Sequence, residues 1–181
     1  MTRIRPIDPD AATGAAAEHL ANTRQAFGQV PNMFATAAQS PAAVQALNAF
    51  FGALGKGVLD GKVGERIAIA VAQQNRCEYC LSAHTAIGGM HGVPAAELDA
   101  AKRGISGDPR AAAAMTFALA VLRHRGQVDD ATLATARAEG LGDPELVEIV
   151  AHVALNVFTN YLNNVAGTEI DFPHVTLDRA A

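Results

Sequence analysis

Tryptophan is absent from this 181-residue chain, aromatic residues make up only 5% of it, and there are just two cysteines. No uncharged apolar segment reaches the roughly 18 residues that a membrane-spanning helix needs. The N-terminal residues also lack the apolar run of a signal peptide. We therefore expect a cytoplasmic protein with no membrane partner. The net charge of −4 gives no electrostatic reason to expect a nucleic-acid partner.

The amino-acid composition favours a helical protein. Hydrophobic residues make up 50% of the chain and charged residues 18%, which is an ordinary balance for one globular domain. Alanine is abundant, and small side chains let helices pack closely. No segment alternates with period two for long enough to indicate a strand. We expect an all-α fold with a single domain over 1–181, a core at about 30–173 and a C-terminal tail at 167–181.

Capping residues mark the expected helix boundaries. Asp-Pro or Ser-Pro pairs put a capping oxygen before a proline, which suits the first helical position, and glycines fall where helices should end. The pairs begin at Asp8, Ser40, Asp108 and Asp143, and the glycines are Gly92, Gly126 and Gly140. The predicted helices span roughly 9–27, 32–39, 41–55, 61–75, 77–91, 94–103, 109–125, 130–139 and 144–165.

The two cysteines lie three residues apart in the segment Cys77–His84, whose sequence is CEYCLSAH. On a helix, residues three and four apart share a face, so Cys77, Cys80 and His84 form one stripe. A nucleophilic thiol, a resolving thiol and a base are what dithiol redox catalysis requires. The positive end of the helix dipole favours Cys77 as the attacking sulfur, whereas proximity to His84 favours Cys80. The residues leave that choice open.

Glu65 lies twelve residues before Cys77, in an early turn of the preceding helix. Its carboxylate could simply stabilise the start of that helix and pair with Arg66. An antiparallel return over this distance would bring Glu65 alongside the turn after the cysteines, not to their level. A catalytic Glu65 would then need a kinked entry or a bridging water.

Other chemistries fit the cysteine segment less well. A zinc site would use Cys77, Cys80 and His84, with Glu65 or His91 as a fourth ligand, but no second ligand pair is present. Covalent haem attachment needs a histidine directly after the second cysteine, and Leu81 occupies that place. A passive buried pair would leave the spacing of the two sulfurs unexplained. We expect no metal and no cofactor.

Two further segments carry polar patterns. A stripe on the last predicted helix favours a solvated face over a subunit interface or a wall of the site. It consists of His152, Asn156, Asn160 and Asn163, opposite Val153, Val157, Tyr161 and Val165. The tail from Gly167 is polar and contains Pro173, so we expect it to lie, without a helix, over the surface or a neighbouring subunit.

The pattern of Glu65 followed by Cys77-x-x-Cys80-x-x-x-His84 resembles the active-site signature of the alkyl hydroperoxidase D (AhpD)-like group of the carboxymuconolactone decarboxylase superfamily. Segments 30–34, 40–41 and 169–173 resemble its peroxidase-related branch, so the similarity covers about 30–173. The resemblance implies an all-α, AhpD-like domain that assembles as a homotrimer or homohexamer.

The resemblance also implies a role for each residue of the signature. Cys80 would attack the O–O bond of a hydroperoxide and become a sulfenic acid, which Cys77 would convert into a disulfide. Glu65 and His84 would relay protons, with a water between them and the sulfurs. An external dithiol or redox-protein reductant would then restore the two thiols.

One residue departs from the family pattern. Members with a peroxiredoxin partner carry a histidine immediately before the second cysteine, and here Tyr79 occupies that place. Tyrosine does not exchange protons readily near neutral pH, so the expectation of a peroxiredoxin partner weakens. Alternatives to a thiol peroxidase are thiol–disulfide exchange, a decarboxylase-like activity, or a non-catalytic metal-binding or redox-sensing protein.

Overall fold

The computed structural model describes residues 1–179, and within that range the chain forms α-helices and no β-strand. The helices are α1 (Gly14–Phe27), α2 (Asn32–Ala37), α3 (Pro41–Leu54), α4 (Gly61–Gln74), α5 (Glu78–Met90), α6 (Ala95–Ala101), α7 (Pro109–Arg123), α8 (Asp130–Ala138) and α9 (Asp143–Ala166). The all-α prediction is confirmed, and each predicted helix is present. None of these described helices is both long and apolar enough to cross a membrane.

Two of the predicted caps form as expected. The Ser40 side chain accepts a hydrogen bond from the Ala43 N–H at the start of α3. The Asp108 carboxylate accepts two, from the N–H groups of Arg110 and Ala111 at the start of α7. Each bond satisfies a backbone donor that has no partner inside the helix.

The other two predicted caps are wrong. α1 begins at Gly14 and not at Pro9, because Asp8 uses its carboxylate to accept the Asp10 N–H in a local turn, a common alternative for aspartate. Asp143 is already inside α9, whose cap is Gly142. There Glu145 accepts the Gly142 N–H at 2.8 Å.

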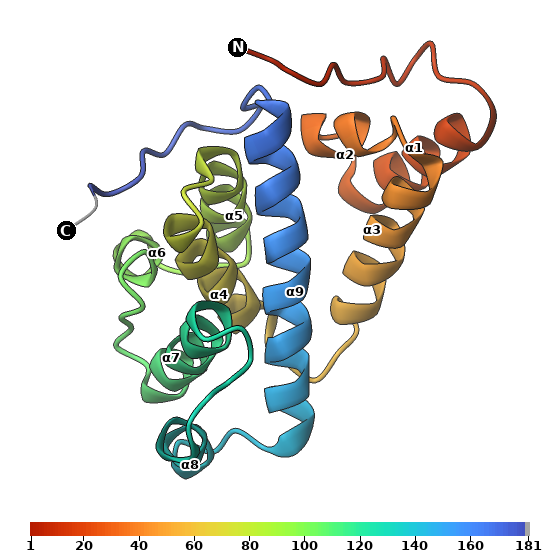
Figure 1. Ribbon diagram of the computed structural model, residues 1–181. Helices are drawn as coiled ribbons and strands as arrows, with labels where there is room; N and C mark the ends of the chain where they lie inside the picture. The colour runs from red at the N-terminus through yellow and green to blue at the C-terminus, as the bar shows by residue number, and fades with distance from the viewer. Residues whose placement is uncertain (180–181) are drawn as a thin grey trace.

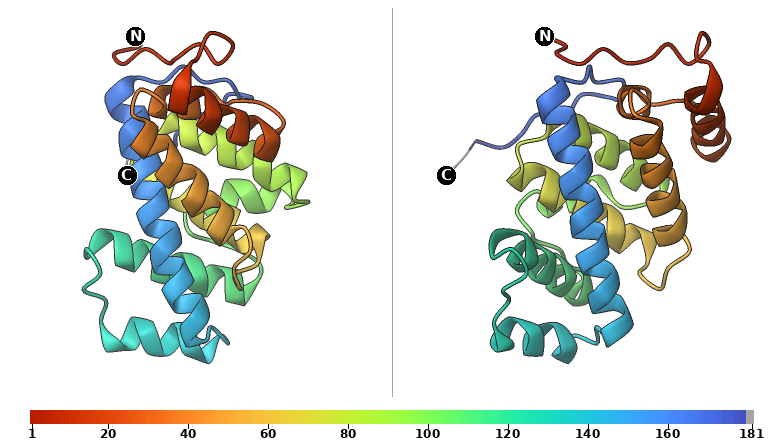
Figure 2. Two further views of the ribbon diagram at one scale, coloured as in Figure 1. Left: turned by 90° about the vertical axis from the view of Figure 1, so that its right-hand side faces the viewer. Right: turned by 45° about the vertical axis from the view of Figure 1, so that its right-hand side comes forward.

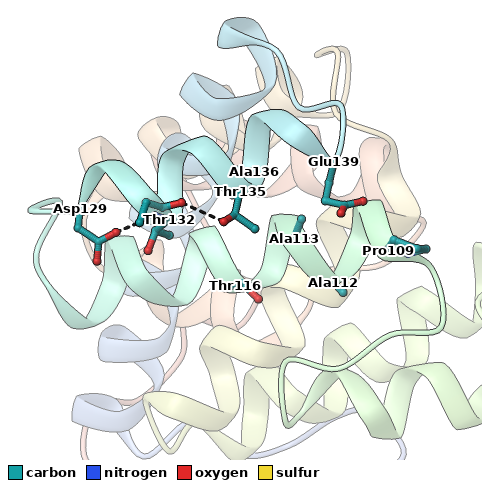
Figure 3. Close-up of a pocket in the computed structure, with 10 residues that line it drawn as sticks. Pro109, Ala112, Ala113, Thr116, Asp129, Thr132, Thr135, Ala136 and Glu139 are labelled. Atoms are coloured by element: carbon teal, nitrogen blue, oxygen red, sulfur yellow. Dashed lines mark hydrogen bonds between the residues drawn. The ribbon is translucent and has the colours of Figure 1, made fainter.

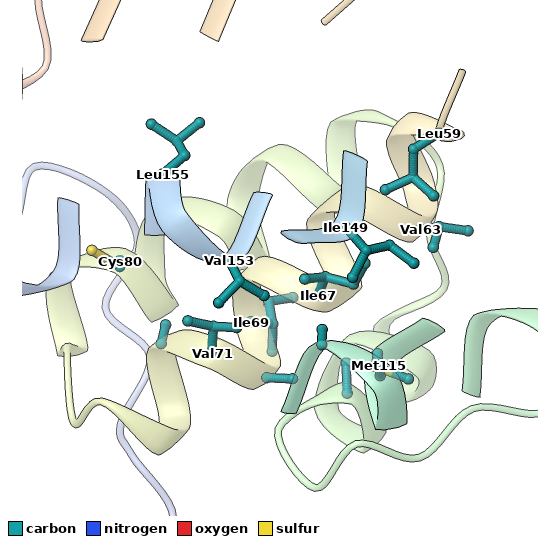
Figure 4. Packing of buried hydrophobic residues seen from close by; sticks show 14 of the residues in the cluster. Leu59, Val63, Ile67, Ile69, Val71, Cys80, Met115, Ile149, Val153 and Leu155 are labelled. Carbon is teal, nitrogen blue, oxygen red and sulfur yellow. The ribbon is translucent and has the colours of Figure 1, made fainter. Parts of the chain in front are cut away.

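Helix α4 lies at the centre of the fold and contacts α5, α7 and α9. Its residues Ile67, Ile69 and Val71 are fully buried, as expected of a helix that is apolar all round. Figure 4 shows these side chains packed towards Ile149 of α9 and Met115 of α7. The centre of α4 is therefore fixed by neighbours on several sides, which makes it a rigid base for the helix that follows.

Helix α9 runs the length of the molecule, with α1–α3 on one side of it and α4–α8 on the other (Figure 1). Both chain ends cross the same end of α9 (Figure 2). At that end the N–H groups of Arg3 and Ile4 donate to the Ala166 carbonyl, at 2.6 and 3.1 Å.

The tail after α9 is non-helical, as predicted, and it lies over α4 and α5 of its own chain. The Val175 N–H donates to Ser82 Oγ at 3.0 Å. The Asp178 carbonyl accepts from Arg76 Nη1 at 2.6 Å, and the Asp178 N–H donates to Gln73 Oε1 at 3.1 Å. Residues 180 and 181 of the predicted tail lie outside the described residues.

Candidate functional site

A tight turn between α4 and α5 places the first cysteine. The Cys77 N–H donates to the Ala72 carbonyl at 2.9 Å and the Arg76 N–H donates to Gln73 at 3.2 Å, the paired bonds of a Schellman motif. Arg76 adopts a positive φ of 57°, the left-handed conformation that this motif requires. The turn therefore reverses the chain within two residues and starts α5 at the cysteines.

The two sulfurs are buried, unbridged and unequal. Cys77 is the N-cap of α5, and its Sγ accepts the Cys80 N–H at 3.3 Å. The exposed fractions of Cys77 and Cys80 are 0% and 2%. The hydrogen bond between the two thiols, together with burial, raises the pKa of Cys77 far above its usual value. Cys77 therefore gives up its proton less readily than an ordinary cysteine.

Helix α9 supplies further groups to the second sulfur. Asn163 Nδ2 donates to Cys80 Sγ at 3.2 Å. Burial raises the pKa of Cys80, but the hydrogen bond with Cys77, the charge of His84, and the amides of Asn163 and Asn160 lower it to about 7. Hydrogen bonds and an opposite charge favour the ionised form of an acid, which explains why the pKa of Cys80 is lowered.

Glu65 and His84 form a hydrogen-bonded pair. Glu65 Oε2 lies 2.9 Å from His84 Nδ1, which carries the proton because an ionised carboxylate only accepts. Burial lowers the pKa of His84, but the charge of Glu65 outweighs burial and raises it above its usual value. Nδ1 is thus held by the carboxylate, and Nε2 is the nitrogen left to exchange a proton.

The antiparallel helices therefore bring Glu65 to the turn after the cysteines, at the level of His84 and not of the sulfurs. The alternative in which Glu65 pairs with Arg66 is not what forms. Arg66 Nη2 instead lies 3.5 Å from Glu97 Oε2 of α6. The four residues of the signature thus lie on two neighbouring helices, as two sulfurs and one acid–base pair.

The polar stripe of α9 is not solvated, so that prediction is wrong. Asn156, Asn160 and Asn163 are all buried. Their helix turns its polar face towards the start of α5, where Asn163 meets Cys80 and Asn160 Oδ1 accepts from Asn75 Nδ2 at 3.0 Å. Protein polar groups replace water as the partners of this stripe, which satisfies most of its hydrogen-bonding atoms.

Comparison with known proteins agrees with this geometry. The carboxymuconolactone decarboxylase family matches residues 41–122, which include all four residues of the signature. An alkyl hydroperoxide reductase of Mycobacterium tuberculosis, Rv2159c, is 35% identical over 89 residues, which cover 47% of this chain and 25% of that protein. An uncharacterised protein of Haemophilus influenzae is 40% identical over 68 residues, covering 37% of this chain and 55% of that one. The chain thus spans from a quarter to about half of the length of these relatives.

A solved structure extends the likeness to nearly the whole chain. It is a peroxidase-related protein of Ralstonia eutropha JMP134, described as an alkylhydroperoxidase AhpD core. The two share 26% identity with a TM-score of 0.83, over 94% of this chain and 92% of the other. Over residues 41–122 the chain thus resembles the carboxymuconolactone decarboxylase family, and its fold is similar to that of an AhpD core.

The AhpD-like fold also occurs in a protein with a different activity. The debrominase Bmp8, solved in complex with 2,3,4-tribromopyrrole, has a TM-score of 0.79 and 20% identity, over 94% of this chain and 92% of that one. At this identity the similarity establishes the fold alone.

Tyr79, the departure from the AhpD-like pattern, serves packing. Its hydroxyl accepts the Met33 N–H of α2 at 3.1 Å, and its ring meets Phe172 of the tail edge-on, with 5.8 Å between centroids. Burial raises the pKa of Tyr79, so its hydroxyl stays protonated. The side chain joins α5 to α2 and the tail and takes no part in proton transfer.

The zinc alternative gains no support from the geometry. Across residues 1–179, no group of three or more His, Cys, Asp or Glu side chains is arranged to hold a metal ion. His91 is the C-cap residue of α5.

An open pocket lies away from the sulfurs. It is a groove of about 520 Å³ between α7 and α8, lined mainly by alanine and threonine (Figure 3). Its charged residues are Asp129 and Glu139, and Asp129 is already used to cap α8. No thiol or imidazole lines it, so the pocket offers nothing to the dithiol chemistry.

Proposed function

We propose that this protein is a thiol-dependent peroxidase that reduces an alkyl hydroperoxide at Cys80. The observation that carries the proposal is the contrast between the two sulfurs: Cys80 Sγ accepts a hydrogen bond from Asn163 Nδ2 of α9, which helps to lower its pKa, whereas Cys77 is buried as the N-cap of α5 and its pKa is raised. A thiolate is the nucleophilic form of cysteine, so Cys80 is the sulfur primed to attack.

In the first step the Cys80 thiolate attacks the terminal oxygen of the hydroperoxide. An S–O bond forms, the O–O bond breaks, and the electron pair leaves on the alkoxide. The protonated His84, oriented by Glu65, supplies the proton that turns the alkoxide into an alcohol. The sulfur is oxidised to a sulfenic acid and the peroxide is reduced.

In the second step Cys77 resolves the sulfenic acid. The Cys77 sulfur attacks that of Cys80, a disulfide forms, and the hydroxyl leaves as water with the Cys77 proton. Because Cys77 Sγ already lies against the Cys80 N–H, the resolving sulfur is one helical turn from its target. An external dithiol or a redox protein then reduces the disulfide by thiol exchange.

The main rival of this reaction is thiol–disulfide exchange at the same two sulfurs. Cys77 and Cys80 are 0% and 2% exposed, so a hydroperoxide and a reductant alike need the site to open before they reach either sulfur. A reducing compartment such as the cytoplasm fits a resting state with free thiols.

We further propose that the chain forms a homo-oligomer, a trimer or hexamer, through α9. The face of α9 opposite the asparagines is exposed and apolar, and its largest exposed members are Val147, Phe158, Tyr161 and Val165. Turning polar groups inward and apolar groups outward is costly for a monomer. A second copy that covers this face removes the cost.

The test of the peroxidase function is hydroperoxide consumption driven by dithiothreitol. We expect turnover by the wild type, none above background in Cys80→Ser, and slower turnover in Cys77→Ser, in which only the external dithiol can reduce the sulfenic acid on Cys80. His84→Gln and Glu65→Gln should lose about a hundredfold or more, the usual contribution of a positioned acid or base. The matched control is His91→Gln, an exposed histidine at the end of the same helix, which should retain full activity.

Equal activity in all these proteins would refute the site. Reduction of a small disulfide without peroxide turnover would instead assign the chain to the exchange enzymes. Stoichiometric zinc in the purified protein, lost on mutating either cysteine, would revive the metal alternative.

A further inference from the structure

Two buried asparagine side chains beside Cys80, those of Asn160 and Asn163, each have an atom without a hydrogen-bond partner in residues 1–179. Asn163 donates from Nδ2 to the sulfur, but its Oδ1 has no partner within residues 1–179. Asn160 accepts at Oδ1 from Asn75, and its Nδ2 has no acceptor in that part of the chain other than the neighbouring Cys80 thiol, whose pKa it helps to lower. The exposed fractions of Asn160 and Asn163 are 0% and 3%. Buried polar atoms are rarely left unpaired, so each calls for an explanation.

Both asparagine side chains lie next to the Cys80 sulfur. Asn163 contacts Cys80 directly, and the amide of Asn160 lies close enough to help lower the pKa of the same thiol. The two residues are three apart on α9, and so they share a face one turn in length. Figure 4 shows Cys80 beside α9, at the edge of the apolar cluster. What remains unpaired is one N–H donor and one carbonyl acceptor, both next to the attacking atom.

A hydroperoxide is complementary to that pair. Its terminal oxygen carries an O–H that needs an acceptor, and its inner oxygen takes up the negative charge when the O–O bond breaks. A disulfide has no O–H or N–H to donate to a carbonyl, and would leave the acceptor unpaired. One donor and one acceptor beside the sulfur therefore match a hydroperoxide better than they match a disulfide.

We infer that Asn160 and Asn163 are the hydroperoxide-binding residues of Cys80, an inference that rests on the proposed function. Asn163 Oδ1 accepts the O–H of the terminal oxygen and so aims that oxygen at the sulfur. Asn160 Nδ2 donates to the inner oxygen and stabilises the alkoxide as the O–O bond breaks and the S–O bond forms. His84 then supplies the proton that completes the alcohol.

The test compares two reactions of the same sulfur in a Cys77→Ser background. One is the single-turnover rate with tert-butyl hydroperoxide, and the other is alkylation by iodoacetamide at a pH where Cys80 is fully ionised. We expect Asn160→Leu to slow the peroxide reaction by about tenfold or more, the effect of one lost hydrogen bond, and to leave alkylation within about twofold. Asn163→Leu should slow the peroxide reaction likewise and also raise the pKa of Cys80.

The matched control is Asn156→Leu, one turn earlier on the same stripe, whose amide bonds its own helix at His152. It should leave both reactions unchanged. If Asn160→Leu does not fold, Asn160→Ser, which is too short to place a donor at the same point, repeats the comparison. Circular dichroism melting curves verify that each variant is folded.

Three outcomes would overturn the inference. Equal losses in both reactions would mean that the amides only tune the thiol. Unchanged peroxide rates in the asparagine variants, with an active wild type, would remove the subsite and leave the peroxidase function standing. A wild type that never reacts with the peroxide would overturn the proposed function and the subsite together.

Discussion

The two sulfurs of the site are chemically identical side chains that the fold makes unequal. Cys77 caps a helix with its sulfur and shares a hydrogen bond with Cys80. Cys80 Sγ additionally accepts a hydrogen bond from Asn163 Nδ2, and the charge of His84 lowers the pKa of Cys80. The chain spacing alone supports either sulfur as the nucleophile, because dipole and base favour different ones. The asymmetry comes from α9, more than eighty residues away in the sequence.

The first prediction concerns the pH dependence of thiol reactivity. With the pKa of Cys80 lowered to about 7, its thiolate fraction and its alkylation rate should rise with pH and reach half their maximum near pH 7. Cys77, whose pKa is raised, should stay unmodified throughout. Iodoacetamide labelling followed by peptide mass mapping measures both. Labelling of Cys77 before Cys80 would contradict the assignment.

A second prediction concerns Tyr79. In Tyr79→Phe the Met33 N–H loses its buried acceptor, so the free energy of unfolding should fall by about 1 to 3 kcal/mol. Peroxide turnover should persist, because the hydroxyl bonds to α2 and not to either sulfur. Urea denaturation measures the change. Thr135→Val, which removes an exposed hydroxyl on α8, is the control and should shift stability by less than about 0.5 kcal/mol.

At the scale of the helices, the sequence predicted where each helix lies along the chain. It did not predict which face of every helix is buried. Periodicity and capping residues located α4, α5 and α9, because both signals are local. The burial of the α9 asparagines could not be predicted in the same way, because a polar stripe looks the same whether it faces water or a buried thiol. The apolar residues on the other face of α9, such as Phe158 and Tyr161, were the one sign in the sequence that the asparagines face inward.

The third prediction compares Asp108, which caps a helix, with Asp8, which was predicted to cap one and does not. Asp108→Ala removes an oxygen that accepts two N–H groups at the start of α7, so stability should fall by about 1 kcal/mol. Asp8→Ala should cost distinctly less, because Asp8 closes an exposed turn outside any helix. Thermal or urea melts of both variants give the comparison. Equal losses would restore the sequence-based boundary of α1.

At the scale of the whole molecule, the site is assembled by packing three helices. α4 supplies Glu65, α5 supplies both sulfurs and His84, and α9 supplies the amides. The signature from Glu65 to His84 was predictable from the family resemblance, and the tight turn between two consecutive helices brings Glu65 beside His84. The contribution of α9 was not predictable, because it depends on how the end of the chain packs back against the middle.

The fourth prediction concerns assembly. If copies of the chain associate through the apolar face of α9, light scattering coupled to size exclusion should give a trimer or hexamer for the wild type. Phe158→Asp should reduce that mass, because a charge buried in an apolar interface is costly. Ile105→Asp, an equally drastic change at an exposed position between α6 and α7, is the control and should keep the wild-type mass. A monomeric wild type would contradict this interface.

The central claim is that Cys80 takes oxygen from a hydroperoxide and Cys77 resolves the product. Mass spectrometry after one equivalent of hydroperoxide tests it most directly. We expect wild-type protein to lose two hydrogen atoms and yield a linked Cys77–Cys80 peptide. We expect Cys77→Ser to gain one oxygen atom on Cys80, which dimedone captures, and Cys80→Ser to remain unmodified. An oxygen found on Cys77 in Cys80→Ser, or unreacted thiols in the wild type, would contradict the account.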